Sequence, residues 1–196
     1  MDIIIRKAKS DEGTAIAQVI ARSFEKDFGM FAKSLDQVAK LFESGVNAER
    51  FLVAEQGGKL IGILGCGDRN VRSLAPSKKS VRQTLGLVRG FLVNMIMAEE
   101  FLKPFDYPET TGWVEIVGVL EEARGKGVVK ALLSEMISHF PQYDEFILNT
   151  QDTNHAALGL YAKFGFGEFM RVPYKFAKHT DFESKVHMRY TKKEIA

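Results

Sequence analysis

The spacing of hydrophobic residues along the first third of the chain predicts both strands and helices. Residues 3–5 form a short apolar run typical of a strand, and residues 35–42 fit a short helix. Ser10 is expected to cap an earlier helix whose apolar residues share one face, namely Ile16, Val19, Ile20 and Phe24. Residues 51–55 and 60–66, joined by a Gly57-Gly58 turn, predict a β-hairpin.

A longer helical pattern lies within residues 69–112 and is centred on residues 82–102. One stripe of this helix is apolar and consists of Leu85, Val88, Leu92, Met95 and Leu102, with Phe91 and Ile96 beside it. Such a stripe usually packs into the core, with a lid over a substrate and a dimer contact as alternatives. Pro104, Pro108 and Gly112 end the helix and lead into another strand.

The second half of the chain alternates strands and helices more regularly. Strands are predicted over residues 113–119, 145–150 and 184–190, and helices over residues 127–140 and from Asn154 to residues 164–165. On the first helix, apolar residues recur at three- and four-residue spacing, as a helix packed on a sheet requires. The order β-α-α-β-β-(helix)-β-α-β-α-β-β predicts a mixed α/β fold with one core, in a single domain over residues 1–196.

Composition narrows the class of protein. The 196 residues are 45% hydrophobic and 27% charged, as in an ordinary globular domain, and a net charge of +2 gives no support to a nucleic-acid partner. The longest uncharged apolar run of the central segment, residues 90–98, is far shorter than the roughly 20 residues that span a bilayer. With no signal peptide pattern at the N-terminus, we expect a cytoplasmic protein without a membrane partner.

Cys66 is the only cysteine, so no disulfide can form within the chain. Its place in a predicted hairpin strand favours buried packing over a role as nucleophile. No cluster of His, Cys and Asp residues has the spacing of a metal site, and no metal is expected.

A glycine-rich turn opens the helix that begins near residue 127. It reads Arg124-Gly125-Lys126-Gly127-Val128-Val129-Lys130. Unpaired main-chain N–H groups and the helix dipole favour an anion at such a place, although a tight turn also uses glycine for purely structural reasons. A dinucleotide-binding loop would need glycine at position 130, and a P-loop would need Ser or Thr at position 127. The turn therefore predicts a phosphate site of another kind.

Roughly 30 residues later comes Leu160-Tyr161-Ala162-Lys163-Phe164-Gly165-Phe166. This segment and the turn, in this order and spacing, resemble the GNAT superfamily of acetyl-CoA-dependent N-acyltransferases. The turn of that family follows Gln/Arg-x-x-Gly-x-Gly/Ala, which Arg124 and Gly127 match and Val129 does not. The resemblance is strong over residues 113–166. It implies a central, strongly bent mixed β-sheet flanked by helices, with the helical segment inserted between the third and fourth strands.

The resemblance also implies acetyl-CoA as co-substrate. The turn residues Arg124, Gly125, Lys126, Gly127, Val128, Val129 and Lys130 would hold its pyrophosphate, chiefly through main-chain amides. The end of the preceding strand, at Val117, Gly118 and Val119, would bind the thioester end by main-chain hydrogen bonds. Asn154 would contact the pantetheine arm and also cap its helix. We expect the Val129 side chain to turn inward with the apolar stripe of its helix, rather than crowd the cofactor.

Acyl transfer to an amine needs a proton acceptor, a stabilised oxyanion and a proton for the leaving thiolate. The resemblance assigns that last proton to Tyr161, which could instead fill an apolar helix face with Ala157 and Phe164. Glu115 is our candidate base, because strand alternation places it on the face of Val117 and Val119. Some relatives carry Glu where this chain has Asn149. Other candidate bases are His155, Glu109 and Asp106.

The sequence thus predicts an N-acetyltransferase that moves acetyl from acetyl-CoA to a primary amine in a ternary complex. Val129 and Asn149 favour an alternative, a catalytically weak acyl-CoA sensor or interaction module. A third hypothesis is a coenzyme-free domain that binds a partner through the helix of residues 82–102. The acceptor is open among a small polyamine, an aminoglycoside, an amino acid and a protein N-terminus. A homodimer through the apolar helix is our preferred assembly.

Overall fold

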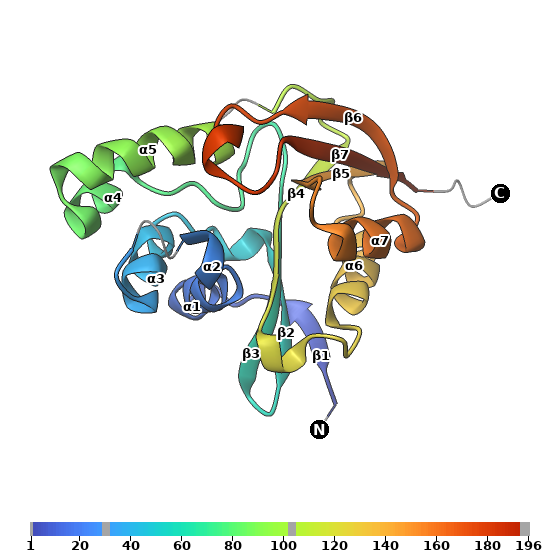
Figure 1. The fold of residues 1–196 in the computed structure, drawn as a ribbon. Coiled ribbons are helices and arrows are strands. Elements are labelled where there is room, and N and C mark those ends of the chain that lie inside the picture. Colours follow the sequence, from blue (N-terminus) through green and yellow to red (C-terminus); the bar gives the residue numbers. More distant parts are fainter. Residues whose placement is uncertain (1, 29–31, 102–104, 193–196) are drawn as a thin grey trace.

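The structure is a computed structural model that describes residues 2–28, 32–101 and 105–192. Its centre is a seven-stranded sheet with the order β1-β2-β3-β4-β5-β7-β6 (Figure 1). The strands are β1 Ile4–Lys7, β2 Phe51–Gln56, β3 Lys59–Gly67, β4 Thr111–Val119, β5 Glu145–Gln151, β6 Gly167–Pro173 and β7 Ser184–Thr191. Neighbouring strands are antiparallel except for β4 and β5, which are parallel. The predicted mixed sheet is confirmed.

Helices cover both faces of this sheet. They are α1 Gly13–Ser23, α2 Glu25–Phe28, α3 Leu35–Glu43, α4 Lys78–Leu85, α5 Leu87–Phe101, α6 Val128–His139 and α7 His155–Phe164. α1 and α3 pack together on one face, and α6 and α7 lie on the other (Figure 1). Each face has its own hydrophobic cluster, and the α6 cluster includes Leu132, Leu133 and Met136, as the three- and four-residue spacing predicted.

Helix α1 begins later than the Ser10 cap predicted. Its first residue is Gly13, and Glu12 occupies the N-cap position without a side-chain bond to the helix. The Glu12 carboxylate instead accepts hydrogen bonds from Arg6, at 2.6 and 2.8 Å, and from the Lys9 N–H at 2.7 Å. This ion pair organises the entry to the helix, and the expected Ser10 cap is wrong. The predicted face is buried at Ile16, Val19 and Ile20.

The inserted segment holds two helices where one was predicted. Gly86 ends α4 with a φ of 78°, a left-handed conformation that glycine adopts without strain. The chain then folds back, so that a Cβ at Gly90 would lie 2.8 Å from the Cα of Arg82. The resulting hairpin lies between β3 and β4, where the insertion was expected.

This reversal turns the predicted core stripe to the outside. Val88, Leu92 and Met95 are 78%, 56% and 47% exposed, whereas Val93 and Met97 are buried. Leu85 is partly buried against the α1–α3 cluster. Leu102, Pro104 and the side chain of Ile96 lie outside the residues that the structure describes. The prediction that this stripe packs into the core is therefore wrong for its described members on α5.

Candidate active site

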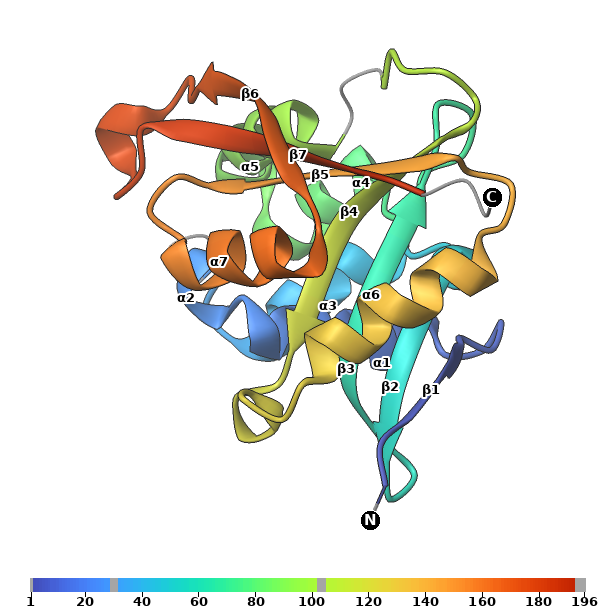
Figure 2. The same cartoon turned by 90° about the vertical axis from the view of Figure 1, so that its right-hand side faces the viewer.

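Strands β4 and β5 separate part-way along their length. They pair in parallel only from Thr111 and Glu145 to Val114 and Leu148. Beyond that point β4 continues beside β3, and β5 continues beside β7. Figure 2 shows the two strands running apart. The inner edges of residues 115–119 and 149–151 therefore face a gap without ladder partners, and an extended ligand can use their main-chain groups.

Main-chain alternation decides which groups of β4 face this gap. The Leu120 N–H donates to the Ile61 oxygen of β3 at 2.9 Å. In an antiparallel ladder alternate residues bond to the same neighbour, so the N–H and C=O groups of Gly118 also point to β3. Those of Val117 and Val119 point into the gap. Gly118 serves a different purpose, since a Cβ there would lie 3.1 Å from the Ser23 side chain on α1.

The glycine-rich turn leads from the end of β4 into α6. Gly125 and Gly127 have φ values of 74° and 78°, and Gly127 is the N-cap of α6. Within the described part of the chain, the six N–H groups of residues 125–130 have no hydrogen-bond acceptor. Lys126 and Lys130 are exposed beside them. The turn therefore offers a group of main-chain donors and two cations to an anion.

The remaining side chains of the turn point elsewhere. Val128 is buried, and Val129 packs against the α6 cluster, so the expected inward orientation of Val129 is confirmed. The Arg124 guanidinium donates to the Ser23 main-chain oxygen at 3.4 Å, at the end of α1. The main-chain N–H groups of Val128 and Val129 stay available, whereas that of Arg124 donates to the Glu121 oxygen at 3.1 Å.

Helix α7 begins directly after β5 and carries the two other predicted residues. The Asn154 side chain accepts from the Ala157 N–H at 3.1 Å, which confirms its role as N-cap. Two turns later, Tyr161 is half-buried against the α6 cluster, with its ring edge-on to Phe166 at a centroid distance of 5.9 Å. Burial raises the pKa of the Tyr161 hydroxyl to about 12. The hydroxyl donates no hydrogen bond to any described residue. The catalytic role of Tyr161 stays a prediction.

Glu115 lies on the opposite side of the sheet from the one predicted. Ile116 pairs with Gly65 and Val114 with Cys66, so Glu115 sits in a β-bulge that shifts the alternation of β4. Its carboxylate accepts from the N–H groups of Ser73 and Leu74, at 2.7 and 3.0 Å, and from the side chains of Arg72 and Ser73. Val117 and Val119 lie on the face that α6 covers, so the prediction that Glu115 shares their face is wrong.

The environment of Glu115 is that of a structural anchor. Its side chain is 1% exposed, and both carboxylate oxygens are engaged. The other candidate bases are exposed: His155 at the start of α7, and Asp106 and Glu109 in the loop before β4, where Glu109 accepts from Asn70 at 3.5 Å. Cys66 is fully buried as expected, and burial raises the pKa of its thiol.

His187 is a candidate that the sequence pattern did not indicate. It lies on β7 opposite Asn149, one residue beyond the last β4–β5 pair, and its ring is edge-on to Phe169 of β6 at 6.2 Å. Its neighbours Val186 and Met188 face the α6 cluster, so alternation directs His187 to the other face. Burial, together with the charge of Lys185, lowers the pKa of the His187 imidazole below its usual value. A neutral imidazole at this place can accept a proton.

Aromatic rings line the same face of the sheet. Trp113 of β4 stacks on Phe105 at 4.5 Å, Phe105 contacts Tyr107, and Tyr107 is edge-on to Phe169 at 6.4 Å. The guanidinium of Arg189 lies 4.5 Å from the centre of the Phe169 ring. The rings of Phe105, Tyr107 and Trp113 come from one short stretch of the chain and that of Phe169 from β6, and together they form a wall beside His187.

The model of the acetyltransferase (GNAT) family matches residues 15–166, which is most of the chain. The chain belongs to the GNAT family. No curated protein matches it. Its fold is that of GNAT acetyltransferases, and the domain is an acetyltransferase domain of that family.

Solved structures share the GNAT fold over nearly the whole chain. An N-acetyltransferase from Staphylococcus aureus Mu50 has a TM-score of 0.63 at 17% identity, over 95% of this chain and 100% of its own. A protein of Salmonella typhimurium that is assigned as an acetyltransferase, solved with its cofactor acetyl-CoA, has a TM-score of 0.62 at 18% identity, over 99% of this chain and 96% of its own. The ribosomal-protein-S18-alanine N-acetyltransferase of Escherichia coli has 0.59 at 14%, over 100% and 99%. At these identities the likeness concerns the fold.

Among the described residues, no group of three His, Cys, Asp or Glu side chains is placed to hold a metal ion. Within the same residues, no helix has the length and apolar character needed to cross a membrane.

Proposed function

We propose that the protein transfers an acetyl group from acetyl-CoA to a primary amine by direct attack in a ternary complex. The observation that carries the proposal is the path from the unpaired edge of β4 to the unpaired N–H groups of residues 125–130. An extended arm fits the first, and a diphosphate fits the second. The family and the Salmonella neighbour with acetyl-CoA support the same assignment.

The residues at hand suit coenzyme A. The main-chain groups of Val117 and Val119 would bind the amides of the pantetheine arm, and Asn154 would contact the arm from the start of α7. The N–H groups of residues 125–130 would bind the pyrophosphate, each charge-assisted bond contributing about 1.5–3 kcal/mol. Exposed Lys126 and Lys130 would add favourable charge.

In the reaction, the amine nitrogen attacks the thioester carbonyl carbon, and the carbon–sulfur bond breaks. The Tyr161 hydroxyl gives its proton to the departing thiolate. A pKa of about 12 keeps this hydroxyl protonated at neutral pH, so it has a proton to donate. Burial also raises the pKa of a coenzyme A thiol beside it, which narrows the gap between the pKa values of donor and acceptor. The tyrosinate then recovers a proton from solvent.

The amine must also lose a proton, and we assign that step to His187, directly or through one water. Its lowered pKa leaves it neutral at pH 7. Its position opposite Asn149 is next to the place where β4 and β5 part. Glu115 is less suited to the role, because four donors already hold its carboxylate. The aromatic wall beside His187 favours an acceptor with an apolar body next to its amine.

A second candidate function is an acyl-CoA sensor with little chemistry. It is favoured by Asn149, which cannot accept a proton where some relatives carry Glu, and by the engaged state of Glu115. One experiment separates the two functions: coenzyme A is tested for thermal stabilisation of the protein, and thiol release from acetyl-CoA is followed over a panel of primary amines. Stabilisation with amine-dependent thiol release supports the transferase, and stabilisation alone supports the sensor. If neither stabilisation nor thiol release is seen, both functions are contradicted.

The compartment and assembly are also proposals. A single free thiol, Cys66, suits a reducing compartment, and we place the protein in the cytoplasm. The acceptor is a small-molecule or peptide amine. The apolar stripe of α5 favours a homodimer, and the excess of positive charge on α4 and α5 opposes it.

A further inference from the structure

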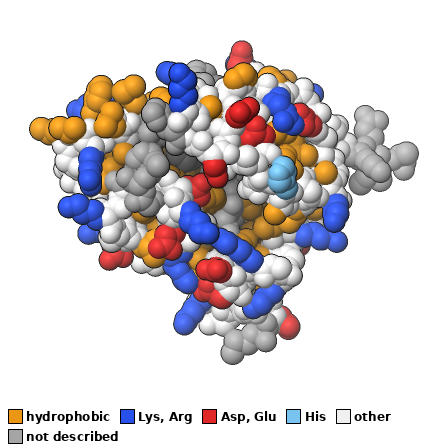
Figure 3. All heavy atoms as spheres, in the orientation of Figure 1, with side chains coloured by type: hydrophobic (Ala, Val, Ile, Leu, Met, Phe, Trp, Pro, Cys, Tyr) orange, Lys and Arg blue, Asp and Glu red, His pale blue; other side chains and the backbone are white. Residues whose placement is uncertain are grey.

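Helix α5 presents an apolar surface that nothing in the described chain covers. Its members are Leu87, Val88, Phe91, Leu92 and Met95, which are 80%, 78%, 56%, 56% and 47% exposed. Their spacing places them on one side of the helix. We call this set the α5 stripe. In Figure 3 hydrophobic side chains gather at the upper left, over the hairpin of α4 and α5. An exposed group of large apolar side chains marks an interaction surface.

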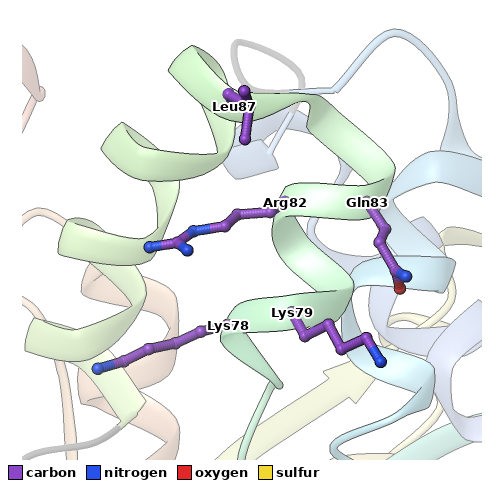
Figure 4. A pocket seen from close by; sticks show the side chains of 5 residues that line it. All are labelled: Lys78, Lys79, Arg82, Gln83 and Leu87. Atoms are coloured by element: carbon purple, nitrogen blue, oxygen red, sulfur yellow. The ribbon is translucent and has the colours of Figure 1, made fainter.

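Positive charge lies beside the start of the α5 stripe, at Leu87. Figure 4 shows an open depression lined by Lys78, Lys79, Arg82 and Gln83 of α4 and by Leu87 of α5, with Lys78 and Arg82 extending to the same side of α4. Arg89 lies within α5 and is exposed. None of these four cations forms an ion pair with a described residue.

The net charge of this region is positive along the sequence as well. Helices α4 and α5 contain four basic residues against two acidic ones, Glu99 and Glu100 near the end of α5, whereas the chain as a whole has 27 basic and 25 acidic residues. The basic residues are Lys78, Lys79, Arg82 and Arg89. The partner of this surface is therefore anionic as well as apolar.

We propose that the α4–α5 hairpin is a peripheral membrane contact for an anionic lipid surface. Helices that lie in the membrane interface combine Leu and Phe on one face with Lys and Arg at its borders, as this hairpin does. The hairpin projects from the body of the molecule, so it can reach a flat surface (Figure 1). Anionic headgroups would pair with Lys78, Lys79 and Arg82 while the α5 stripe enters the headgroup layer.

A second copy of the chain suits the hairpin less well. A two-fold contact places the same patch of both copies face to face. Such a contact would bring the cations of both copies together, and the two helices carry only two carboxylates, Glu99 and Glu100, against four cations. The expectation of no membrane partner rested on the absence of a run long enough to span a bilayer, and a peripheral contact needs no such run.

The test uses flotation of the full chain with two kinds of vesicle, phosphatidylcholine alone and equal parts of phosphatidylcholine and phosphatidylglycerol. We expect the protein to float only with the anionic vesicles, and binding to weaken when salt is raised from about 0.1 to about 0.5 M. Phe91→Ser with Leu92→Ser should lower partitioning more than about tenfold. Lys78→Gln, Lys79→Gln and Arg82→Gln together should lower it about tenfold or more.

Matched controls distinguish vesicle binding through this surface from nonspecific binding. Ile4→Thr removes a side chain that is 58% exposed on β1, far from the hairpin, and should leave partitioning unchanged. The same holds for Lys26→Gln, Lys59→Gln and Lys163→Gln, three exposed lysines elsewhere. Because every substituted side chain is exposed, melting temperatures should stay close to that of the parent chain.

Three results would overturn the proposal. The first is flotation that is equal with neutral and anionic vesicles or absent with both. The second is a dimer in light scattering that Phe91→Ser with Leu92→Ser splits, since a second copy then covers the α5 stripe. The third is loss of flotation in the Ile4→Thr control. The proposal is independent of the transferase function, because flotation is measured without substrate.

Discussion

The carboxylate of Glu115 accepts a hydrogen bond from the main-chain N–H of Ser73 at 2.7 Å. This bond ties the bulge of β4 to the segment that leads from β3 into α4. Arg72, which also binds Glu115, places its guanidinium 4.4 Å from the centre of the Trp113 ring. One carboxylate thus organises the start of the inserted segment beside the proposed site.

Glu115→Gln is expected to destabilise the protein by about 2 kcal/mol, because an acceptor for four donors loses its charge and one of its oxygens. Chemical denaturation measures the loss. The value of kcat in the folded fraction should change less than about threefold. A large fall in kcat with unchanged stability would instead restore Glu115 as the base.

Tyr161→Phe is expected to lower kcat by about 100-fold or more, because the thiolate loses its proton donor. The dissociation constant of coenzyme A should stay nearly unchanged, since the proposed binding contacts are main-chain groups. Calorimetry and thiol release measure the two quantities. Tyr190→Phe is the matched control, because its ring also packs against Phe166 and Phe164 but has no assigned role. Equal kcat in both variants would remove the acid role of Tyr161.

His187 gives a pH prediction. Its pKa in the folded protein is below 6.5, so the neutral form accumulates as pH rises through that lower value. The acid limb of kcat/KM should therefore lie below pH 6.5 and disappear in His187→Gln, with a fall of about 100-fold on the plateau. Folding stability should also decrease as pH drops below 6.5, because the unfolded chain binds this proton more readily. Lys185→Gln should move the limb to higher pH. An unchanged limb in His187→Gln would exclude His187 as the base.

Substitution of Val129 tests the one position of the turn that departs from the family pattern, which has Gly or Ala there. Because the side chain packs against the α6 cluster, Val129→Ala should cost about 1–2 kcal/mol of folding stability and leave coenzyme A affinity unchanged. Lys26→Ala, at an exposed helical position, is the control and should leave both folding stability and coenzyme A affinity nearly unchanged. Tighter coenzyme A binding by Val129→Ala would show that the valine crowds the ligand.

Sequence patterns located most of the sheet because their signals are local. The hairpin of β2 and β3, the cap at Asn154 and the inward side of α6 follow from turn residues and spacing within a few positions. The predictions that proved wrong depend on features that a short stretch of sequence does not show. A single left-handed glycine, Gly86, reversed the insert and exposed its stripe, and one bulge moved Glu115 to the other face.

The site was predictable only where its residues are consecutive. The turn of residues 124–130 and the segment around Tyr161 are continuous motifs. His187 gives no local signal, because its neighbours Phe169 and Asn149 come from other strands and its lowered pKa arises from burial.

Titration of the 15N-labelled protein with coenzyme A tests the central claim most directly, because it reports on individual main-chain amides. The account predicts saturable shifts at Val117, Val119 and residues 125–130, with little change at the exposed stripe of α5. Binding that leaves these amides unmoved, or no saturable binding at all, would contradict the proposed acetyl-CoA site.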